Sequence, residues 1–379
     1  MTGWDEASLR AELGTLPQEL RERLRALDFD TEGWLDRGRR LASGSGQSRP
    51  SGQVEFVLAQ DLLNVSALDE ATLRQATRLG EEALRAGECA LVVLAGGMAT
   101  RMGGIVKALA DALPGHTFLD LRLREQASLA ERFGATPPLW LMTSHGTHEA
   151  LTTTLGERLD GVNLAAFPQS VSLRWTPQAA LFRGGDGLPS LYASGHGDLP
   201  DALRRSGLLD RFVAGGGRYV MACNIDNLGA GLDPLLIGLH LLGDAAISCE
   251  VVDKIPGDRG GIPVRVGDRA VILEEFLLPS GFDPTRVTVF NSNTLAFDAR
   301  ALLSLEHEWS YFEVHKQVDG QEVVQFERLV HESTFWLPTR YLRVPREGAS
   351  TRFLPCKDLA ELEARRPAIE ALARQRGML

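Results

Sequence analysis

The residues with the clearest chemical potential lie in one glycine-rich stretch, 91–107, which reads LVVLAGGMATRMGGIVK. An apolar run ends at Gly96 and Gly97, and Arg101 and Lys107 follow. Glycines let backbone N–H groups approach anionic oxygens, and the two cations add positive charge. The stretch therefore predicts a phosphate-binding loop at the end of a buried strand. A strand-to-helix turn without a ligand is the alternative, because glycine-rich turns often follow strands.

The loop differs from the two best-known phosphate motifs. Lys107 is followed by Ala108, so the hydroxyl of G-x-x-x-x-G-K-[ST] is missing, and G-x-G-x-x-G is absent as well. The pattern present is G-G-x-x-T-R-x-G-G-x-x-K. The loop must therefore be interpreted together with the motifs that follow it.

Eight further motifs follow the loop. They are TFLDL at 117–121, FPQS at 167–170, GHGD at 195–198, SGLLD at 206–210, CNIDNLGA at 223–230, GG at 260–261, FNSNTLAF at 290–297 and RFLPCKDL at 352–359. In this order, they resemble the eukaryotic-type UTP–glucose-1-phosphate uridylyltransferases over about residues 85–360. The resemblance implies an enzyme that forms UDP-sugar and pyrophosphate from UTP and a sugar 1-phosphate, most simply glucose 1-phosphate.

The implied reaction is an in-line attack of a sugar phosphate oxygen on the α-phosphorus of UTP. Because that oxygen is ionised at neutral pH, the site needs positioning and charge neutralisation rather than a general base. The resemblance assigns the neutralising charges to Lys107, Lys254, Lys357 and Arg101. It assigns Asp226 to Mg²⁺ and to the nucleotide. The alternatives are solvated surface lysines and, for Asp226, a helix N-cap.

The resemblance also implies two sets of binding residues. The nucleotide set is Ala95, Gly96, Gly97, Gln169, Gly195 and Asp226, with Gln169 at the uracil edge. The sugar set is His196, Asn224, Glu274, Asn291 and Asn293. Amide and carboxylate groups suit this task because they read the donors and acceptors of hydroxyl groups. An ordinary polar residue at a strand end is the alternative for Gln169.

The loop departs from the family at Ala99, where the family has glycine, and at Ile105 and Val106, where it has Gly-Pro. A Cβ at position 99 restricts positive φ angles. Ala99→Gly is therefore expected to leave turnover intact or to raise it, measured as kcat/KM for pyrophosphate release. A fall of at least about tenfold would show that this loop is aligned wrongly.

Two other functions stay open. The segment FNSNTLAF differs from the family's usual F-N-T-N-N, so galactose 1-phosphate or an N-acetylhexosamine 1-phosphate is an alternative substrate. A catalytically weak UDP-sugar-binding sensor is the second, although the retained cations argue for catalysis. Eukaryotic members of the family continue into a left-handed β-helix that this sequence lacks, so oligomerisation through that domain is not expected, and the oligomeric state stays undetermined.

The elements that must position these residues alternate along the chain. Strands are expected at 89–95, 139–144, 163–168 and 219–223, and helices over 67–87, 119–133, 147–158 and 198–214. This alternation indicates a mostly parallel sheet covered by helices, whose ligands bind beyond the strand ends. The resemblance narrows the fold to a Rossmann-like, nucleotide-diphospho-sugar transferase (GT-A-like) α/β fold. An antiparallel extension on the sugar side is expected from strands within 247–297.

The chain divides into four predicted parts. They are a helical N-terminal appendage at 1–42, a flexible linker at 43–53, the catalytic domain at 54–357 and a C-terminal helix at 358–379. The linker reads SGSGQSRPSGQ, a composition typical of flexible connections.

The bulk composition limits the partners. The 379 residues carry a formal net charge of −10, which argues against nucleic acid as the main partner. The four cysteines have no zinc-site spacing and indicate a reducing compartment. The N-terminus has no apolar signal core, and no apolar run approaches the ~18 residues of a membrane span. We therefore expect a cytoplasmic protein without a membrane partner.

Overall fold

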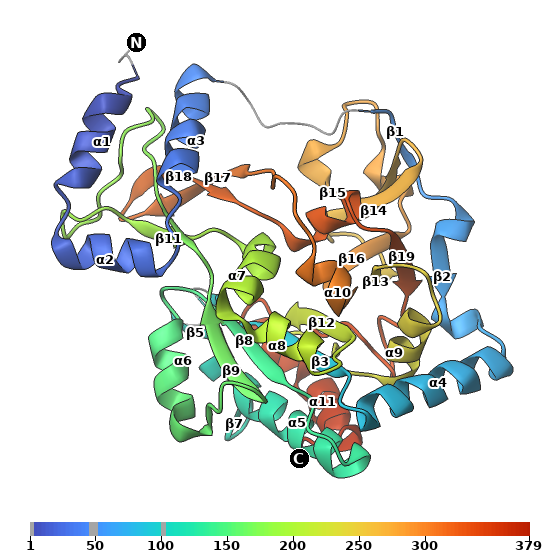
Figure 1. Ribbon diagram of the computed structural model, residues 1–379. Coiled ribbons are helices and arrows are strands. Elements are labelled where there is room, and N and C mark those ends of the chain that lie inside the picture. Colours follow the sequence, from blue (N-terminus) through green and yellow to red (C-terminus); the bar gives the residue numbers. More distant parts are fainter. Residues whose placement is uncertain (1–3, 45–51, 100–103) are drawn as a thin grey trace.

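The computed structural model describes residues 4–44, 52–99 and 104–379. Its centre is an eight-stranded sheet with the order β2-β19-β13-β16-β12-β3-β8-β9 (Figure 1). In that order the strands are Leu62–Asn64, Thr339–Arg343, Ile247–Asp253, Val289–Asp298, Tyr219–Asn224, Cys89–Leu94, Leu139–Thr143 and Leu164–Pro168. Strand β16 runs antiparallel to both neighbours, and the other pairs are parallel. The mixed, mostly parallel sheet is confirmed.

Strand β3 shows why its apolar run forms a central strand. All six of its residues are buried. Cys89, Leu91 and Val93 belong to the apolar core on one face of the sheet. Ala90, Val92 and Leu94 belong to the core on the other. Since successive side chains of a strand point to opposite faces, an uninterrupted apolar run is required where both faces are covered.

Helices cover both faces. The first core receives side chains from α4 (Glu70–Arg85), α5 (Phe118–Phe133), α6 (His148–Leu155), α9 (Pro234–Leu241) and α11 (Leu359–Gln375). The second receives them from α7 (Leu199–Ser206), α8 (Leu208–Ala214) and α10 (Ala299–Leu303). The start of α5 is fixed by a capping box, in which Thr117 and Asp120 each accept a hydrogen bond from the other's backbone N–H.

Three helices precede the sheet: α1 (Glu6–Gly14), α2 (Gln18–Ala26) and α3 (Thr31–Ser43). Their apolar sides pack on β10 (Val171–Leu173), on β11 (Leu191–Ala193), which pairs with β10, and on β18 (Gln321–Glu327). The Trp34 ring stacks on Trp175 with centroids 3.9 Å apart. These helices therefore share a core with the rest of the chain. Residues 45–51 of the predicted linker lie outside the described residues.

The strand-like segments within 247–297 divide between two sheets. Strands β13 and β16 join the central sheet, because β13 pairs with β19 and β16 pairs with β12. Strands β14 (Gly261–Val266) and β15 (Arg269–Glu274) form a three-stranded antiparallel sheet with β1 (Val54–Phe56). The hairpin of β17 (Phe312–Val318) and β18 was not predicted. Within the described ranges, no helix has the length and apolar character needed to cross a bilayer.

Candidate functional site

A cleft of about 1120 Å³ opens at the carboxyl ends of β3, β9 and β12. Most of the predicted site residues line it. They are Gly96, Gly97, Lys107, Gln169, Gly195, His196, Asn224, Asp226, Asn291, Asn293 and Lys357. This is where open α/β sheets bind ligands, because loops from adjacent parallel strands meet there. Ala95, Lys254 and Glu274 are not among the lining residues, and Arg101 lies outside the described residues.

Lys107 and Asp226 meet in this cleft. Asn224 and Leu94 are partners in the parallel register of β12 and β3, so the turns that follow these strands emerge side by side. The Lys107 Nζ donates to Asp226 Oδ2 at 2.7 Å. The backbone N–H of Cys356 donates to the same oxygen at 3.2 Å. Among the described residues, none donates a hydrogen bond to the other carboxylate oxygen, Oδ1.

Asp226 is not a helix N-cap, the alternative raised by the sequence. Helix α9 is capped by Asp233, which accepts hydrogen bonds from the N–H groups of Leu235 and Leu236. Asp226 is 7% exposed and faces the cleft. A single carboxylate next to a triphosphate suits Mg²⁺, which keeps several waters and takes one or two carboxylates plus phosphate oxygens. The described residues contain no cluster of three acidic, histidine or cysteine side chains that would bind a metal alone.

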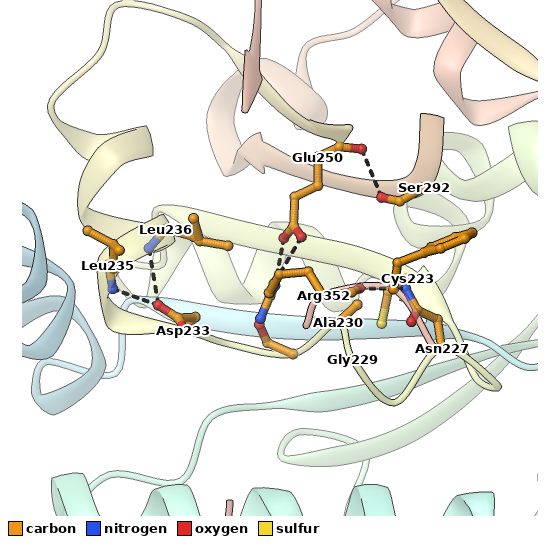
Figure 2. A network of polar contacts seen from close by, with 12 residues as sticks. Cys223, Asn227, Gly229, Ala230, Asp233, Leu235, Leu236, Glu250, Ser292 and Arg352 are labelled. Atoms are coloured by element: carbon orange, nitrogen blue, oxygen red, sulfur yellow. Dashed lines mark hydrogen bonds and ion pairs between the residues drawn. The ribbon is translucent and has the colours of Figure 1, made fainter. Parts of the chain in front are cut away.

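Asn227 fixes the position of the segment that carries Lys357. Its Nδ2 donates to the Arg352 carbonyl at 3.1 Å, and its Oδ1 accepts from the Leu354 N–H at 2.8 Å. Arg352 is held in turn by Glu250 on β13, with Nη2–Oε1 and Nε–Oε2 distances of 2.6 and 2.9 Å (Figure 2). The strand end with Asp226 and the segment with Lys357 are therefore joined through buried polar contacts.

Lys254 is placed differently from the other two lysines. Its Nζ donates to Glu275 Oε1 at 2.6 Å and to the Pro284 carbonyl at 3.3 Å, outside the cleft. The turn that follows it does line the cleft, and the cation of that turn is Arg259. The structure thus brings Lys107, Asp226 and Lys357 together but leaves Lys254 on an ion pair nearby.

Gly96 and Gln169 lie against each other at the ends of β3 and β9. A Cβ on Gly96 would lie 2.4 Å from Gln169 Nε2, so the amide can occupy its place only over a glycine. Ser144 Oγ donates to the Gly96 carbonyl at 2.8 Å and fixes this turn. Ala95, which is buried, precedes the turn, and its carbonyl accepts from Thr147 Oγ1. Gln169 is therefore held at the rim of the glycine-rich loop.

Gly195 and His196 form a second rim of the cleft. Gly195 has a φ of +94°, and a Cβ there would lie 2.6 Å from the Arg328 carbonyl, so this position also requires glycine. The Val330 N–H donates to His196 Nδ1 at 3.0 Å. Burial lowers the pKa of His196 to about 4. The neutral ring therefore carries its proton on Nε2 and can serve only as a donor there.

A β-bulge brings Asn293 to the cleft. Glu250 pairs with Thr294 and Val251 with Asn291, so the register of β13 skips Ser292 and Asn293. Asn293 adopts a φ of +56° and donates from Nδ2 to Asn224 Oδ1 at 3.1 Å. Its own Oδ1 is buried and has no hydrogen-bond partner in the described part of the chain. Bulges of this kind redirect side chains next to binding sites.

Glu274 lines a small cavity that is distinct from the cleft, close to the cleft residue Asn291. Its Oε1 is 3.4 Å from His331 Nε2, and a Cβ on Gly261 would touch both Glu274 and Asn291. Burial, reinforced by Glu275, raises the pKa of Glu274 to about 7. Its predicted contact with the sugar stays a prediction.

The pKa of Glu274 gives a pH dependence of stability. Between its usual pKa of 4.5 and about 7, the folded protein holds a proton that the unfolded chain has lost. The free energy of unfolding should therefore fall as pH rises through this window, by up to about 1.4 kcal/mol per pH unit. Glu274→Gln should remove that contribution, measured by urea unfolding at intervals from pH 5 to 7.5. Identical slopes of unfolding free energy against pH in both proteins would contradict the assignment. Burial also raises the pKa of Glu332, but this contribution to the slope is the same in the wild type and the variant.

Five further cations line the cleft and were missed from the sequence. They are Arg174, Arg259, Lys316, Arg346 and Arg365. Lys316 lies on the unpredicted hairpin, and Arg365 lies on helix α11 next to the Lys357 segment. Arg259 alone had a signal, because it precedes the Gly-Gly pair of a recognised motif. The cleft therefore has more positive charge than the motifs suggested, although Arg346 is paired with Asp258.

A cleft of this charge, at the carboxyl ends of a mostly parallel sheet with a glycine-rich turn beside it, is typical of nucleotide-binding α/β proteins. Comparison with known families makes the class more specific. The family model described as UTP–glucose-1-phosphate uridylyltransferase matches residues 47–368, and the chain belongs to this family.

Individual proteins agree with this assignment. The UTP–glucose-1-phosphate uridylyltransferase of Hordeum vulgare is 31% identical over 294 residues, and that of Encephalitozoon cuniculi is 29% identical over 299. These matches cover 72% and 76% of this chain, which spans only about 60% of the length of those relatives.

Solved structures confirm the fold. A UDP-glucose pyrophosphorylase variant from Leishmania major has a TM-score of 0.71 at 21% identity, covering 90% of this chain and 76% of its own. The UDP-N-acetylglucosamine pyrophosphorylase of Trypanosoma brucei has a TM-score of 0.69 at 18% identity, covering 89% and 74%. Because relatives named for two different sugars share the fold, the fold does not determine the sugar.

Proposed function

We propose that the protein transfers uridylyl from UTP to a sugar 1-phosphate, releasing pyrophosphate. The observation that carries this proposal is the meeting of Lys107, Asp226 and Lys357 in one cleft at the strand ends. A binding protein would need fewer charges, whereas joining two polyanions requires neutralisation at the reacting phosphate. Membership of the family supports the same reaction.

In this proposal the residues divide the work by position. Gln169, held over Gly96, contacts the uracil edge, and the glycine-rich turn approaches the phosphates. Lys107 and Lys357 neutralise charge that develops at the α-phosphate. His196 donates from Nε2 to the sugar. Asn293 accepts from the sugar with its buried Oδ1, for which the described residues supply no donor. The sugar phosphate attacks directly, so the site needs no side chain to remove a proton.

We propose Mg²⁺ as the cofactor, with Asp226 as its protein ligand. Its place in the cleft and its Oδ1, to which no described residue donates, support the assignment. A bound Mg²⁺ would neutralise phosphate charge and orient the triphosphate. The cytoplasm is the proposed compartment, supported by four buried cysteines that are all free thiols.

Glucose 1-phosphate is the proposed acceptor, supported by the names of the relatives. Pyrophosphate release from UTP and Mg²⁺ should be measured with the 1-phosphates of glucose, galactose and N-acetylglucosamine. Release should be fastest with glucose 1-phosphate. Faster release with another sugar would change the substrate but keep the reaction. Tight UDP-glucose binding without pyrophosphate release with any sugar 1-phosphate would contradict the proposed enzyme and favour a UDP-sugar-binding sensor.

Lys357→Ala tests the proposed charge neutralisation. We expect kcat to fall by at least about 10²-fold, because a charge that strengthens binding in the transition state is lost. Lys254→Ala is the matched control, since its ammonium is held by Glu275 outside the cleft; it should lower kcat by less than about tenfold. Equal losses would mean that Lys254 turns into the cleft when substrates bind. A change confined to thermal stability would make Lys357 structural.

A further inference from the structure

A second cleft, of about 460 Å³, lies at strand β10, whose partner strand β11 lines the large cleft. The N-terminal helices and the catalytic part of the chain both contribute to its wall. Arginines dominate the wall: Arg37 comes from α3, Arg204 and Arg205 from α7, and Arg328 follows β18. Ser172 and Tyr311, which both carry hydroxyl groups, also line this cleft.

Arg37 has the least satisfied charge in this cleft. The residue is only 7% exposed. Its guanidinium lies 4.1 Å from the centre of the Tyr311 ring, and its buried Nε has no partner within residues 4–44, 52–99 and 104–379. Its closest carboxylate is Asp30 at 3.9 Å, which is too long for a hydrogen bond. Among the described residues, none accepts a hydrogen bond from this side chain.

The other carboxylates near the cleft are already paired. Asp201 pairs with Arg204 and Arg328, and Asp198 pairs with Arg205 and Arg328. Asp28 pairs with Arg205 at 3.0 Å. Of the four arginines that line this cleft, Arg37 therefore is the one whose guanidinium has no hydrogen-bond acceptor among the described residues. A buried guanidinium without acceptors is unfavourable, and an anion with several oxygens would satisfy its planar set of donors.

Other donors face the same space. Ser172 lines this cleft, and the Arg328 guanidinium lies 5.6 Å from the same Tyr311 ring as Arg37. The Arg37 guanidinium thus faces this cavity next to Arg328, whose own guanidinium is paired with Asp198 and Asp201. A guanidinium suits the tetrahedral oxygens of phosphate because its planar fork can make two parallel hydrogen bonds.

We propose that this second cleft binds inorganic phosphate or a small phosphate monoester, with Arg37 as its principal contact. The site is separate from the substrate cleft, but the two share a wall. Ser170 and Ser194, whose hydroxyls are 2.6 Å apart, line the second cleft. Their chain neighbours Gln169 and Gly195 line the first. A phosphate held here would contact the backbone that supports the nucleotide-binding residues.

Isothermal titration of the full chain with inorganic phosphate, against chloride at equal ionic strength, tests the proposal. Phosphate binding to the second cleft should persist in Lys107→Ala, a variant that weakens anion binding in the substrate cleft. Arg37→Gln should raise Kd by at least about tenfold. Arg39→Gln is the matched control on the same helix, with a side chain 54% exposed, and should leave Kd unchanged. Absence of phosphate binding, or equal Kd in Arg37→Gln and the wild type, would overturn the site.

A second measurement needs no variant. Hydrogen–deuterium exchange of the wild type should show phosphate protecting residues 30–43 and 170–174. Protection confined to the glycine-rich turn would place the ion in the substrate cleft and overturn the proposal. Glycerol phosphate is the comparison ligand: tighter binding than inorganic phosphate would indicate a monoester, and weaker binding would indicate the free ion.

Discussion

Asp226→Asn is expected to lower kcat/KM for UDP-glucose formation by about 10²- to 10³-fold, which is the loss typical of one electrostatic contact at a reacting centre. Asparagine keeps the shape of the side chain and can still accept the hydrogen bond from the Cys356 N–H. It loses the charge that holds Lys107 at 2.7 Å and that would bind Mg²⁺. Initial rates over a Mg²⁺ titration measure the effect, and the variant should require more Mg²⁺.

Glu361→Gln is the control for this result. Glu361 lines the same cleft, and its carboxylate accepts a hydrogen bond from the Lys357 N–H at 2.8 Å, which glutamine can also accept. Both substitutions make the cleft more positive by one charge. If charge alone decided the rate, the two variants would behave alike. Activity of Asp226→Asn within about tenfold of the wild type would contradict the role given to this carboxylate.

Arg352→Leu should produce the largest loss of stability, about 3–5 kcal/mol in the free energy of unfolding. Arg352 and Glu250 form a bidentate pair, and their side chains are 5% and 6% exposed. Removing the arginine leaves a buried carboxylate without its counter-ion. Urea-induced unfolding followed by circular dichroism measures the change.

Two further variants show whether the loss comes from the unpaired charge. The double variant Arg352→Leu with Glu250→Leu should recover much of the loss, because a buried pair is often replaceable by apolar side chains. Arg374→Leu removes an arginine of α11 whose pair with Glu370 is largely exposed, and should change stability by less than about 1 kcal/mol. A double variant no more stable than Arg352→Leu would instead indicate lost packing.

The meeting of Lys107 with Asp226 could be predicted from the sequence for a physical reason. Each residue follows an apolar run that forms a strand buried on both faces, and such strands pair in parallel with their carboxyl ends together. Any two loops that follow adjacent parallel strands must therefore meet. Gln169 was predictable in the same way, since it directly follows β9.

The remaining site residues depend on contacts that a local pattern does not contain. Lys254 directly follows β13, yet it is held by Glu275 from a separate 3₁₀ turn. Asn293 reaches the cleft only through a bulge and a positive φ. The hairpin with Lys316 is half-exposed and packs partly on helices from the other end of the chain. The positions of Lys254, Asn293 and Lys316 therefore depend on tertiary packing, which a local sequence pattern does not show.

The order of strands in the central sheet has a consequence for how this chain is synthesised. Edge strand β2, at residues 62–64, pairs in parallel with β19, at residues 339–343. The two strands are thus separated by most of the chain, and such distant pairing is slow because a large loop must close first. On the ribosome, β2 must wait unpaired until its partner has emerged. This side of the sheet is therefore the last to close and is the part most exposed to aggregation or to chaperones during folding.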